Sequence, residues 1–520
     1  MTPSLTRRAF SATSLPFMLA VLSRQGVAAT DKAPLHLGPA RPFSFAWLRQ
    51  RAHSAAISAY VSPPAPQPDL VDTIDFDASQ KIRFRADCAL WKGTSATYPL
   101  RFFHLNKFVP NPVRLHAVEG RKAREILYSP RCFDYNGLSL AQKLQPDLGY
   151  AGFRVMDGQK VETDWLAFQG ASYFRTSGQD NQYGASARGI AVNTALSTVE
   201  EFPRFSEFWI AESPGTPLTI YALLEGPSLT GAYKFEAVRG NGVVMDVHAE
   251  LFIRTDVTRL GIAPLTSMYW YGENERTHAV DWRPEIHDSD GLALWTGGGE
   301  RIWRPLIDPP RVQTNSFVDT NPKGFGLMQR DRKFENYEDD GAFYNRRPGI
   351  WVEPRGNWGA GAVQLVEIPT DDEIHDNIVA YWQPSAPIKA GDQPVFDYRL
   401  YWQDSEPHPP HDIAEVVTTR IGRGGIPGRP SPKGQWKFVI DFQGGTLDAM
   451  PARYDVSPIV TLSRGKAENR YVIRVVGTNT WRAFFDVNVT GRDPLDLRCY
   501  LKLGDKTLSE TWLYQFFPPA

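Results

Sequence analysis

Short runs of strand-forming residues, separated by glycine and proline, recur along this 520-residue chain and limit the folds that it can adopt. Residues 81–86, 218–223 and 243–249 alternate polar and apolar side chains or are rich in β-branched residues. Helical periodicity is scarce, and the best candidate for a helix is residues 45–60. These patterns predict a mostly β protein of sandwich sheets and disfavour a doubly wound α/β fold.

A dense cluster of proline and glycine between residues 406 and 434 predicts a domain boundary, because regular elements do not accommodate so many breakers. We expect an N-terminal domain over residues 30–407, a linker over 408–434 and a C-terminal domain over 435–520. The last segment contains strand-like runs at 436–442, 459–462, 471–476, 481–489 and near Trp512. Their number and spacing are typical of an immunoglobulin-like sandwich.

The N-terminus predicts export from the cytoplasm. Arg7 and Arg8 precede a mildly apolar run over residues 12–22, and small residues follow at 27–29. This order is typical of a twin-arginine signal over residues 1–29, which directs a folded protein to the bacterial periplasm. No later run approaches the roughly 20 apolar residues that span a bilayer, so no membrane span is expected after cleavage.

The composition favours a neutral partner. The formal net charge is −1, which implies no basic surface for nucleic acid. Aromatic residues make up 12% of the chain and include 15 tryptophans, which suits a saccharide groove as well as an ordinary β core. The three cysteines, Cys88, Cys132 and Cys499, allow at most one disulfide, and we expect packing as the main role of each.

Two acid-rich loops stand out in the polar and aromatic region 268–382. Residues 282–291 read WRPEIHDSDG and follow an aromatic run at 269–271, whereas residues 371–377 read DDEIHDN and precede a strand-like run at 378–382. Glycoside hydrolysis needs one carboxylic acid to protonate the leaving oxygen and a second group to activate water, and each loop offers an acid. The alternative is that these acids have no catalytic role, are exposed to solvent and cap turns.

A metal site is the less favoured alternative for the same loops. His287, Asp288, His375 and Asp376 are possible ligands, but their spacing is not that of the common zinc hydrolases. We therefore predict no metal and no cofactor. The nucleophile elbow, the phosphate-binding loop and the dinucleotide fingerprint are all missing from the sequence. Five tryptophans of the region are candidates for either sugar stacking or core packing: Trp282, Trp303, Trp351, Trp358 and Trp382.

Four segments in one order carry a resemblance. They are FQGASYFR at 168–175, YGASARG at 183–189, DWRPEIHDSDG at 281–291 and FYNRRP at 343–348. Together they resemble the OpgG/OpgD (MdoG/MdoD) family of periplasmic glucan biosynthesis proteins over the whole mature chain. The twin-arginine signal is similar to the signals of the OpgD branch of this family.

The resemblance implies a galactose-mutarotase-like β-sandwich followed by an immunoglobulin-like domain. It also implies an anomer-inverting enzyme acting on β-1,2-glucan, by hydrolysis or by transglycosylation. The family's general acid corresponds to Asp376 and its candidate base to Asp288. Tyr344 and Arg347 correspond to glucan-binding groups, and Glu373 and Trp282 are expected to contact sugar as well.

A second hypothesis assigns the chain a non-catalytic role. In that case it binds glucan and guides chains delivered by an inner-membrane glucan glucosyltransferase, with the C-terminal domain as a docking surface. Such a protein needs the aromatic cleft but not the two acids. The sequence leaves open the choice between hydrolysis and transfer, the chain-length preference and the oligomeric state.

Overall fold

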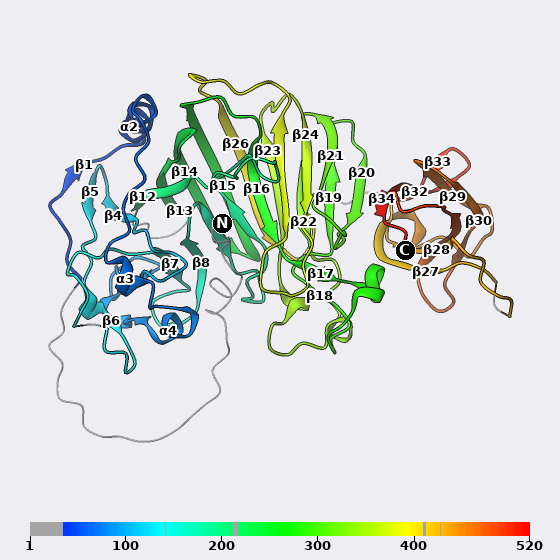
Figure 1. The fold of residues 1–520 in the computed structure, drawn as a ribbon, viewed down its shortest axis with the longest axis horizontal. Coiled ribbons are helices and arrows are strands. Elements are labelled where there is room, and N and C mark those ends of the chain that lie inside the picture. Colours follow the sequence, from blue (N-terminus) through cyan, green and yellow to red (C-terminus); the bar gives the residue numbers. More distant parts are fainter. Residues whose placement is uncertain (1–34, 141, 212–216, 409–411, 427, 520) are drawn as a thin grey trace. The chain divides into compact units, whose positions relative to one another are not determined.

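The computed structural model describes residues 35–140, 142–211, 217–408, 412–426 and 428–519, and the predicted signal sequence lies outside them (Figure 1). Strands make up 46% and helices 9%, which confirms the mostly β prediction. The chain forms two compact units, one from Met1–Leu265 with Tyr381–Trp402 and one from Thr266–Ala380 with Gln403–Ala520. Within the described ranges, no helix has both the length and the apolar character to cross a membrane.

The first unit contains two sheets and a small two-stranded pair. The strands of the first sheet, in spatial order, are β1 (Arg41–Pro42), β5 (Lys122–Glu125), β4 (Arg114–Glu119), β12 (Arg204–Ala211), β13 (Leu218–Glu225), β14 (Leu229–Gly240), β15 (Gly242–Ile253) and β26 (Val395–Gln403). Those of the second are β25 (Ile378–Pro384), β16 (Leu260–Ser267), β10 (Ser186–Arg188), β9 (Tyr173–Thr176), β8 (Asp164–Gln169), β7 (Gly152–Met156) and β3 (Leu100–Phe103), with β11 (Ile190–Val192) beside β16. The pair is β2 (Arg83–Phe84) with β6 (Phe133–Asp134).

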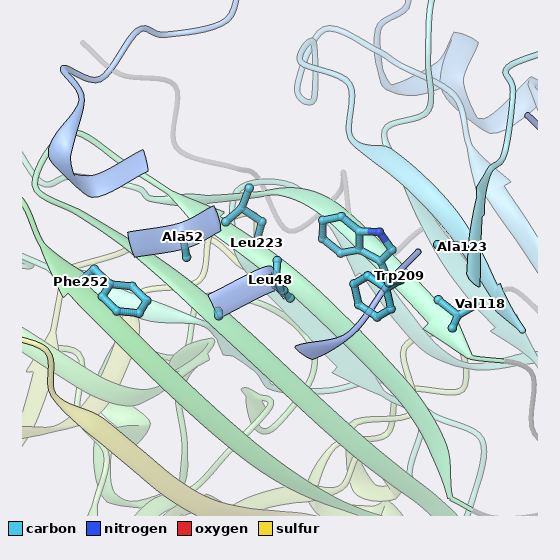
Figure 2. Packing of buried hydrophobic residues seen from close by; sticks show 9 residues of the cluster. Leu48, Ala52, Val118, Ala123, Trp209, Leu223 and Phe252 are labelled. Atoms are coloured by element: carbon cyan, nitrogen blue, oxygen red, sulfur yellow. The ribbon is translucent and has the colours of Figure 1, made fainter. Parts of the chain in front are cut away.

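Helix α2 (Phe45–Ile57) lies where the sequence predicts a helix, over residues 45–60. It covers part of the first sheet (Figure 2). The Ser44 side chain accepts a hydrogen bond from the Trp47 amide at 3.2 Å and so caps the helix. Leu48 and Ala52 lie one turn apart on the buried face, where they pack with Leu223 and other apolar residues of the sheet. This packing fixes the helix on β13, β14 and β15.

The prediction of a strand over residues 81–86 is largely wrong. Of these residues only Arg83–Phe84 forms a paired strand, and the preceding residues form helices α3 (Pro68–Val71) and α4 (Phe76–Lys81). The reason is a local cap: the Asp75 side chain accepts the Ala78 amide at 2.9 Å, which starts the helix that runs to Lys81.

A disulfide joins Cys88 to Cys132 across 44 residues, whereas Cys499 is buried and free. The expectation that packing is the main role is therefore wrong for the first two cysteines. They lie far apart in the sequence, and the pairing of β2 with β6 brings their segments together, which the spacing alone does not reveal.

We expect the Cys88→Ser/Cys132→Ser variant to unfold more easily than the wild type. Closing a loop of this length lowers the entropy of the unfolded chain by an amount equivalent to about 4 kcal/mol. Urea unfolding with and without a reductant measures the effect. The reductant should lower the wild-type midpoint to that of the variant and leave the variant unchanged; an equal response of both proteins would contradict a stabilising disulfide.

The second unit holds the remaining strands. The longest run of neighbours is β23 (Gly349–Arg355), β22 (Gly324–Met328), β19 (Gly291–Trp295), β20 (Arg301–Pro305), β34 (Thr511–Phe516), β32 (Leu495–Leu503) and β29 (Val456–Leu462), with β33 (Lys506–Thr507) beside β32. A four-stranded sheet follows the order β27 (Glu415–Arg423), β28 (Gln435–Gln443), β31 (Trp481–Asn488) and β30 (Lys466–Arg474). Two further pairs are β21 (Gln313–Thr320) with β24 (Ala360–Glu367) and β17 (Tyr269–Tyr271) with β18 (Ile286–His287).

The C-terminal strands form a sandwich with an aromatic core. Phe438 of β28 lies 6.1 Å from the ring of Trp512 on β34, so the two sheets face each other through these side chains. Strand β27 lies inside the segment 408–434, where the sequence predicts only a linker. The breakers cluster on either side of this strand, so regular structure does fit between them. The division of the chain at residues 407 and 435 stays a prediction.

Candidate functional site

Both predicted acid loops are fixed to the same short stretch of chain in the second unit. The Asp288 amide donates to the carbonyl of Met268 at 2.8 Å. The side chain of Asn377, next to Asp376, accepts the amide of Tyr269 at 2.8 Å and donates to the Tyr269 carbonyl at 2.8 Å. Because Met268 and Tyr269 are consecutive, the segments that carry the two acids converge on one place.

Asn377 is a fixing residue that the sequence analysis does not single out. Its side-chain nitrogen also donates to the carbonyl of Ile368 at 2.9 Å, and the Ile368 amide donates to the Asn377 carbonyl at 2.9 Å. These bonds close the loop between Ile368 and Asn377 at its base. The only signal in the sequence is an asparagine at the point where a loop enters an apolar strand.

The turn η5 (Tyr344–Arg346) and the next residue, Arg347, connect the two loops. The Arg347 guanidinium makes an ion pair with Asp288. The central carbon of this guanidinium lies 4.3 Å from the centre of the Tyr344 ring. The Tyr344 hydroxyl donates a short hydrogen bond to Glu373, in the loop of Asp376. The turn and Arg347 therefore contact both loops. The arginine contacts the loop of Asp288, called the base loop after its candidate role, and the tyrosine contacts the loop of Asp376, called the acid loop.

Burial differs sharply among the predicted residues. Asp288 is 2% exposed and Arg347 8%, whereas Asp376 is half-buried and Trp282 is 69% exposed. The other four candidate tryptophans are buried in the protein, so packing is their role: Trp303, Trp351, Trp358 and Trp382. Among the five candidate tryptophans, Trp282 alone has a large exposed surface.

Arg283, beside Trp282, joins three carboxylates. It donates to Asp281 at 2.9 Å, to Asp339 at 2.8 Å and to Glu373 at 3.1 Å. Although burial lowers the pKa of Arg283, hydrogen bonds to these acids raise it overall above the ordinary arginine value. Arg283 and Tyr344 therefore both hold Glu373, at the same carboxylate oxygen. The local sequence does not reveal this role of Arg283 because its partners come from three segments.

Two of the residues considered as metal ligands, His287 and Asp288, have other partners. His287 lies 3.0 Å from both Gln329 and Glu285, and Asp288 pairs with Arg347. In the part of the chain that the structure describes, two groups of three side chains are close enough to share an ion: Glu406 with His408 and Glu415, and Glu273 with Glu285 and Asp331. Neither group includes His287, Asp288, His375 or Asp376.

Fold and site together define a β-sandwich protein with a polar and aromatic site on two loops. An arginine and a tyrosine connect these loops. The profile described as "Periplasmic glucan biosynthesis protein, MdoG" matches residues 43–516. "Glucans biosynthesis protein D 2" of Ralstonia nicotianae is 50% identical over 93% of this chain and 92% of its own length. "Glucans biosynthesis protein D" of Xanthomonas oryzae pv. oryzae is 44% identical over 96% of this chain and 95% of its own length.

The chain belongs to the MdoG family of periplasmic glucan biosynthesis proteins, and within it to the D branch. Its role therefore lies in glucan biosynthesis. This relationship confirms the resemblance carried by the four sequence segments.

Proposed function

We propose that the protein is an anomer-inverting enzyme that acts on linear β-1,2-glucan in the periplasm, with Asp376 as general acid and Asp288 as general base. The observation that carries this proposal is the turn at Tyr344–Arg347, which contacts the base loop and the acid loop at once. Two carboxylates on separate loops are the equipment that glycosidic cleavage requires, and this turn contacts both loops, at Asp288 and at Glu373.

The surroundings of the two acids suit different tasks. Asp288 lies beside the Arg347 guanidinium, and a neighbouring cation favours the charged carboxylate that a base needs. Asp376 is half-buried, so part of its side chain remains accessible to a sugar oxygen. The polar groups of Glu373 and Tyr344 would bind sugar hydroxyls between them, and the relay of a proton from acceptor to Asp288 would run through such hydroxyls.

The acceptor decides the reaction class. If water takes the acceptor position, the enzyme is an endo-acting β-1,2-glucanase, whereas a sugar hydroxyl makes it a transglycosylase or a cyclising enzyme. The products distinguish the two, since hydrolysis yields shorter linear chains and transfer yields cyclic or newly branched glucan.

The test compares wild-type protein with the Asp288→Asn/Asp376→Asn double variant on linear β-1,2-glucan. Mass spectrometry follows the products, and proton NMR at early times follows the anomer of the new chain end. We expect α-anomeric ends or cyclic products from the wild type and none from the double variant. Retention of glucan by both proteins without any product would reject the enzyme and favour the accessory protein that guides chains from an inner-membrane glucosyltransferase.

Trp282 provides a test of the binding surface. We expect Trp282→Ala to raise KM for glucan about tenfold, equivalent to roughly 1.4 kcal/mol, because an exposed indole offers a face for stacking against a sugar ring. Tyr454→Ala is the matched control, since Tyr454 is 95% exposed and lies far along the chain, in the segment just before β29. Equal KM values for wild type and Trp282→Ala would exclude stacking at this residue.

We further propose that residues 1–29 direct export by the twin-arginine route. A reporter fused behind these residues should reach the periplasm, and Arg7→Lys/Arg8→Lys should leave it in the cytoplasm, because the paired arginines are the part of the signal that the exporter reads. Export of the double-lysine fusion at the wild-type level would contradict the proposal.

A further inference from the structure

Gln329 is a buried residue that bonds to two segments of the candidate site, one at His287 and one at Tyr344. It follows β22 and is 1% exposed. Its side-chain nitrogen lies 3.2 Å from the His287 carbonyl and 3.2 Å from the Tyr344 carbonyl, and 2.9 Å from the Tyr337 hydroxyl. The first bond holds the residue next to Asp288, and the second holds the turn that carries Arg347.

These contacts fix the orientation of the amide and, with it, the proton on His287. Carbonyl oxygens only accept hydrogen bonds, so the Gln329 nitrogen must face them and its oxygen must face His287 Nδ1, at 3.0 Å. An oxygen in that place accepts a bond, so His287 Nδ1 carries a hydrogen. In the neutral ring Nε2 is then an acceptor.

The second acceptor in this geometry is Glu285. Its Oε2 lies 3.0 Å from His287 Nε2, and an ionised carboxylate facing a nitrogen lone pair forms no hydrogen bond. Two protonation states remove the conflict. Either Glu285 is a carboxylic acid and donates to Nε2, or the ring carries a second proton and Nε2 donates to the carboxylate. In the first state a chain of donors runs from Glu285 through His287 to Gln329.

The surroundings of Glu285 favour the first state, in which Glu285 carries the proton. Burial, together with the charge of Asp331, raises the pKa of Glu285 to about 8. Burial and the charge of Glu285 raise the pKa of Glu273 to about 8 as well, and Glu273 accepts the Thr419 amide at 3.0 Å. The hydrogen bond with Glu273 acts in the other direction and lowers the pKa of Glu285, but burial outweighs it. The ionisable groups that face Glu285 are Glu273, His287, Asp290, Asp331, Tyr269 and Tyr337.

We propose that Gln329 is a positioning residue for the Asp288 segment, and that it acts by fixing His287 as the Nδ1–H tautomer to which Glu285 donates. The proposal rests on the proposed function for its effect on catalysis, but its statement about His287 holds for the protein without substrate. Gln329 and Glu285 act through His287 and need not touch glucan.

The sign of the pH dependence follows from the proton on Glu285. The acid is protonated below about pH 8, where it donates to His287, and it loses the proton as the pH rises through that value. Above it, a buried carboxylate faces the Nε2 lone pair, and the segment beside Asp288 loses one of its fixed contacts. Turnover of the wild type should therefore show a decline centred near pH 8, the alkaline decline, which is separate from any loss caused by deprotonation of the proposed acid Asp376.

Two variants separate this mechanism from a general loss of stability. Glu285→Gln places an amide donor beside Nε2 at every pH, so it should keep most of the wild-type turnover and show no alkaline decline. Gln329→Met keeps the size of the side chain but removes all of its bonds, and we expect kcat to fall roughly 100-fold, as a misplacement of about 1 Å in a catalytic group can cause.

In Gln329→Met, His287 is also free to adopt the Nε2–H tautomer and donate to ionised Glu285, so the alkaline decline should disappear here too. A purely structural Gln329 would lower the melting temperature and leave the shape of the pH profile as in the wild type. An alkaline decline that persists unchanged in Glu285→Gln would overturn the proposal.

Nitrogen NMR of ¹⁵N-histidine-labelled protein gives a readout that needs no activity. The chain has 10 histidines, and His287→Asn identifies the signal of His287. The Nδ1–H tautomer at pH 7 in the wild type, lost in Gln329→Met, is the expected result; an Nε2–H or doubly protonated ring in the wild type would overturn it. Should glucan turnover be undetectable, the proposed function fails while this spectrum still decides the tautomer.

Discussion

Replacing Asp376 with asparagine is expected to lower kcat for linear β-1,2-glucan by about 10²–10⁴-fold, the usual contribution of a general acid. The amide has the size of the carboxyl group but delivers no proton to the departing oxygen, so KM should change little. Product formation over time measures the effect. An aryl β-1,2-oligoglucoside should recover much of the lost rate, since its leaving group departs without protonation.

Asp371→Asn is the matched control for this experiment. Asp371 is an exposed carboxylate of the same loop, five residues earlier in the sequence, and its replacement changes the same charge. It should leave kcat as in the wild type. Equal losses in both variants, or an aryl substrate that recovers nothing in Asp376→Asn, would show that Asp376 does not act as the acid.

Replacing Arg347 with methionine is expected to lower the free energy of unfolding by about 3–5 kcal/mol, because it leaves the buried carboxylate of Asp288 without its cation. The side chains of the pair are 9% and 3% exposed. The contacts of Arg347 with the Ala342 carbonyl, at 2.9 and 3.1 Å, are lost with it. Urea unfolding measures the change, and glucan turnover should be abolished as well.

The variant Arg347→Met/Asp288→Asn tests the cause. With the charge removed, most of the lost stability should return, while turnover should stay absent. The ion pair of Arg355 with Glu353 serves as the control, since its side chains are 43% and 30% exposed and Arg355→Met should cost roughly 1 kcal/mol or less. A double variant no more stable than Arg347→Met would show that the loss comes from packing and not from the unpaired charge.

The structure brings together the segments that local pattern and family motif select as a site. The two acid loops, Tyr344, Arg347 and Glu373 are brought together in the second unit. Trp282 is the one candidate tryptophan with a large exposed surface. The catalytic roles of Asp376 and Asp288 stay predictions.

The residues that hold these groups in place were not predicted. Arg283, Gln329 and Asn377 each bond to segments that are distant in the sequence, such as Asn377 to Tyr269 across 108 residues and Gln329 to His287 across 42. A polar side chain in a local window looks the same whether it is solvated or buried among partners. Its importance becomes visible only when the partners are known.

The amino-acid sequence by itself determined the β class, the helix at residues 45–57 and the loops that carry the acids, because period, capping and turn preference act over a few neighbouring residues. Tertiary structure alone decided the pairing of Cys88 with Cys132, the ion pair of Arg347 with Asp288 and the contacts of His287 with Glu285 and Gln329. These depend on long-range strand pairing and on burial, which set contact and dielectric surroundings that no local pattern encodes.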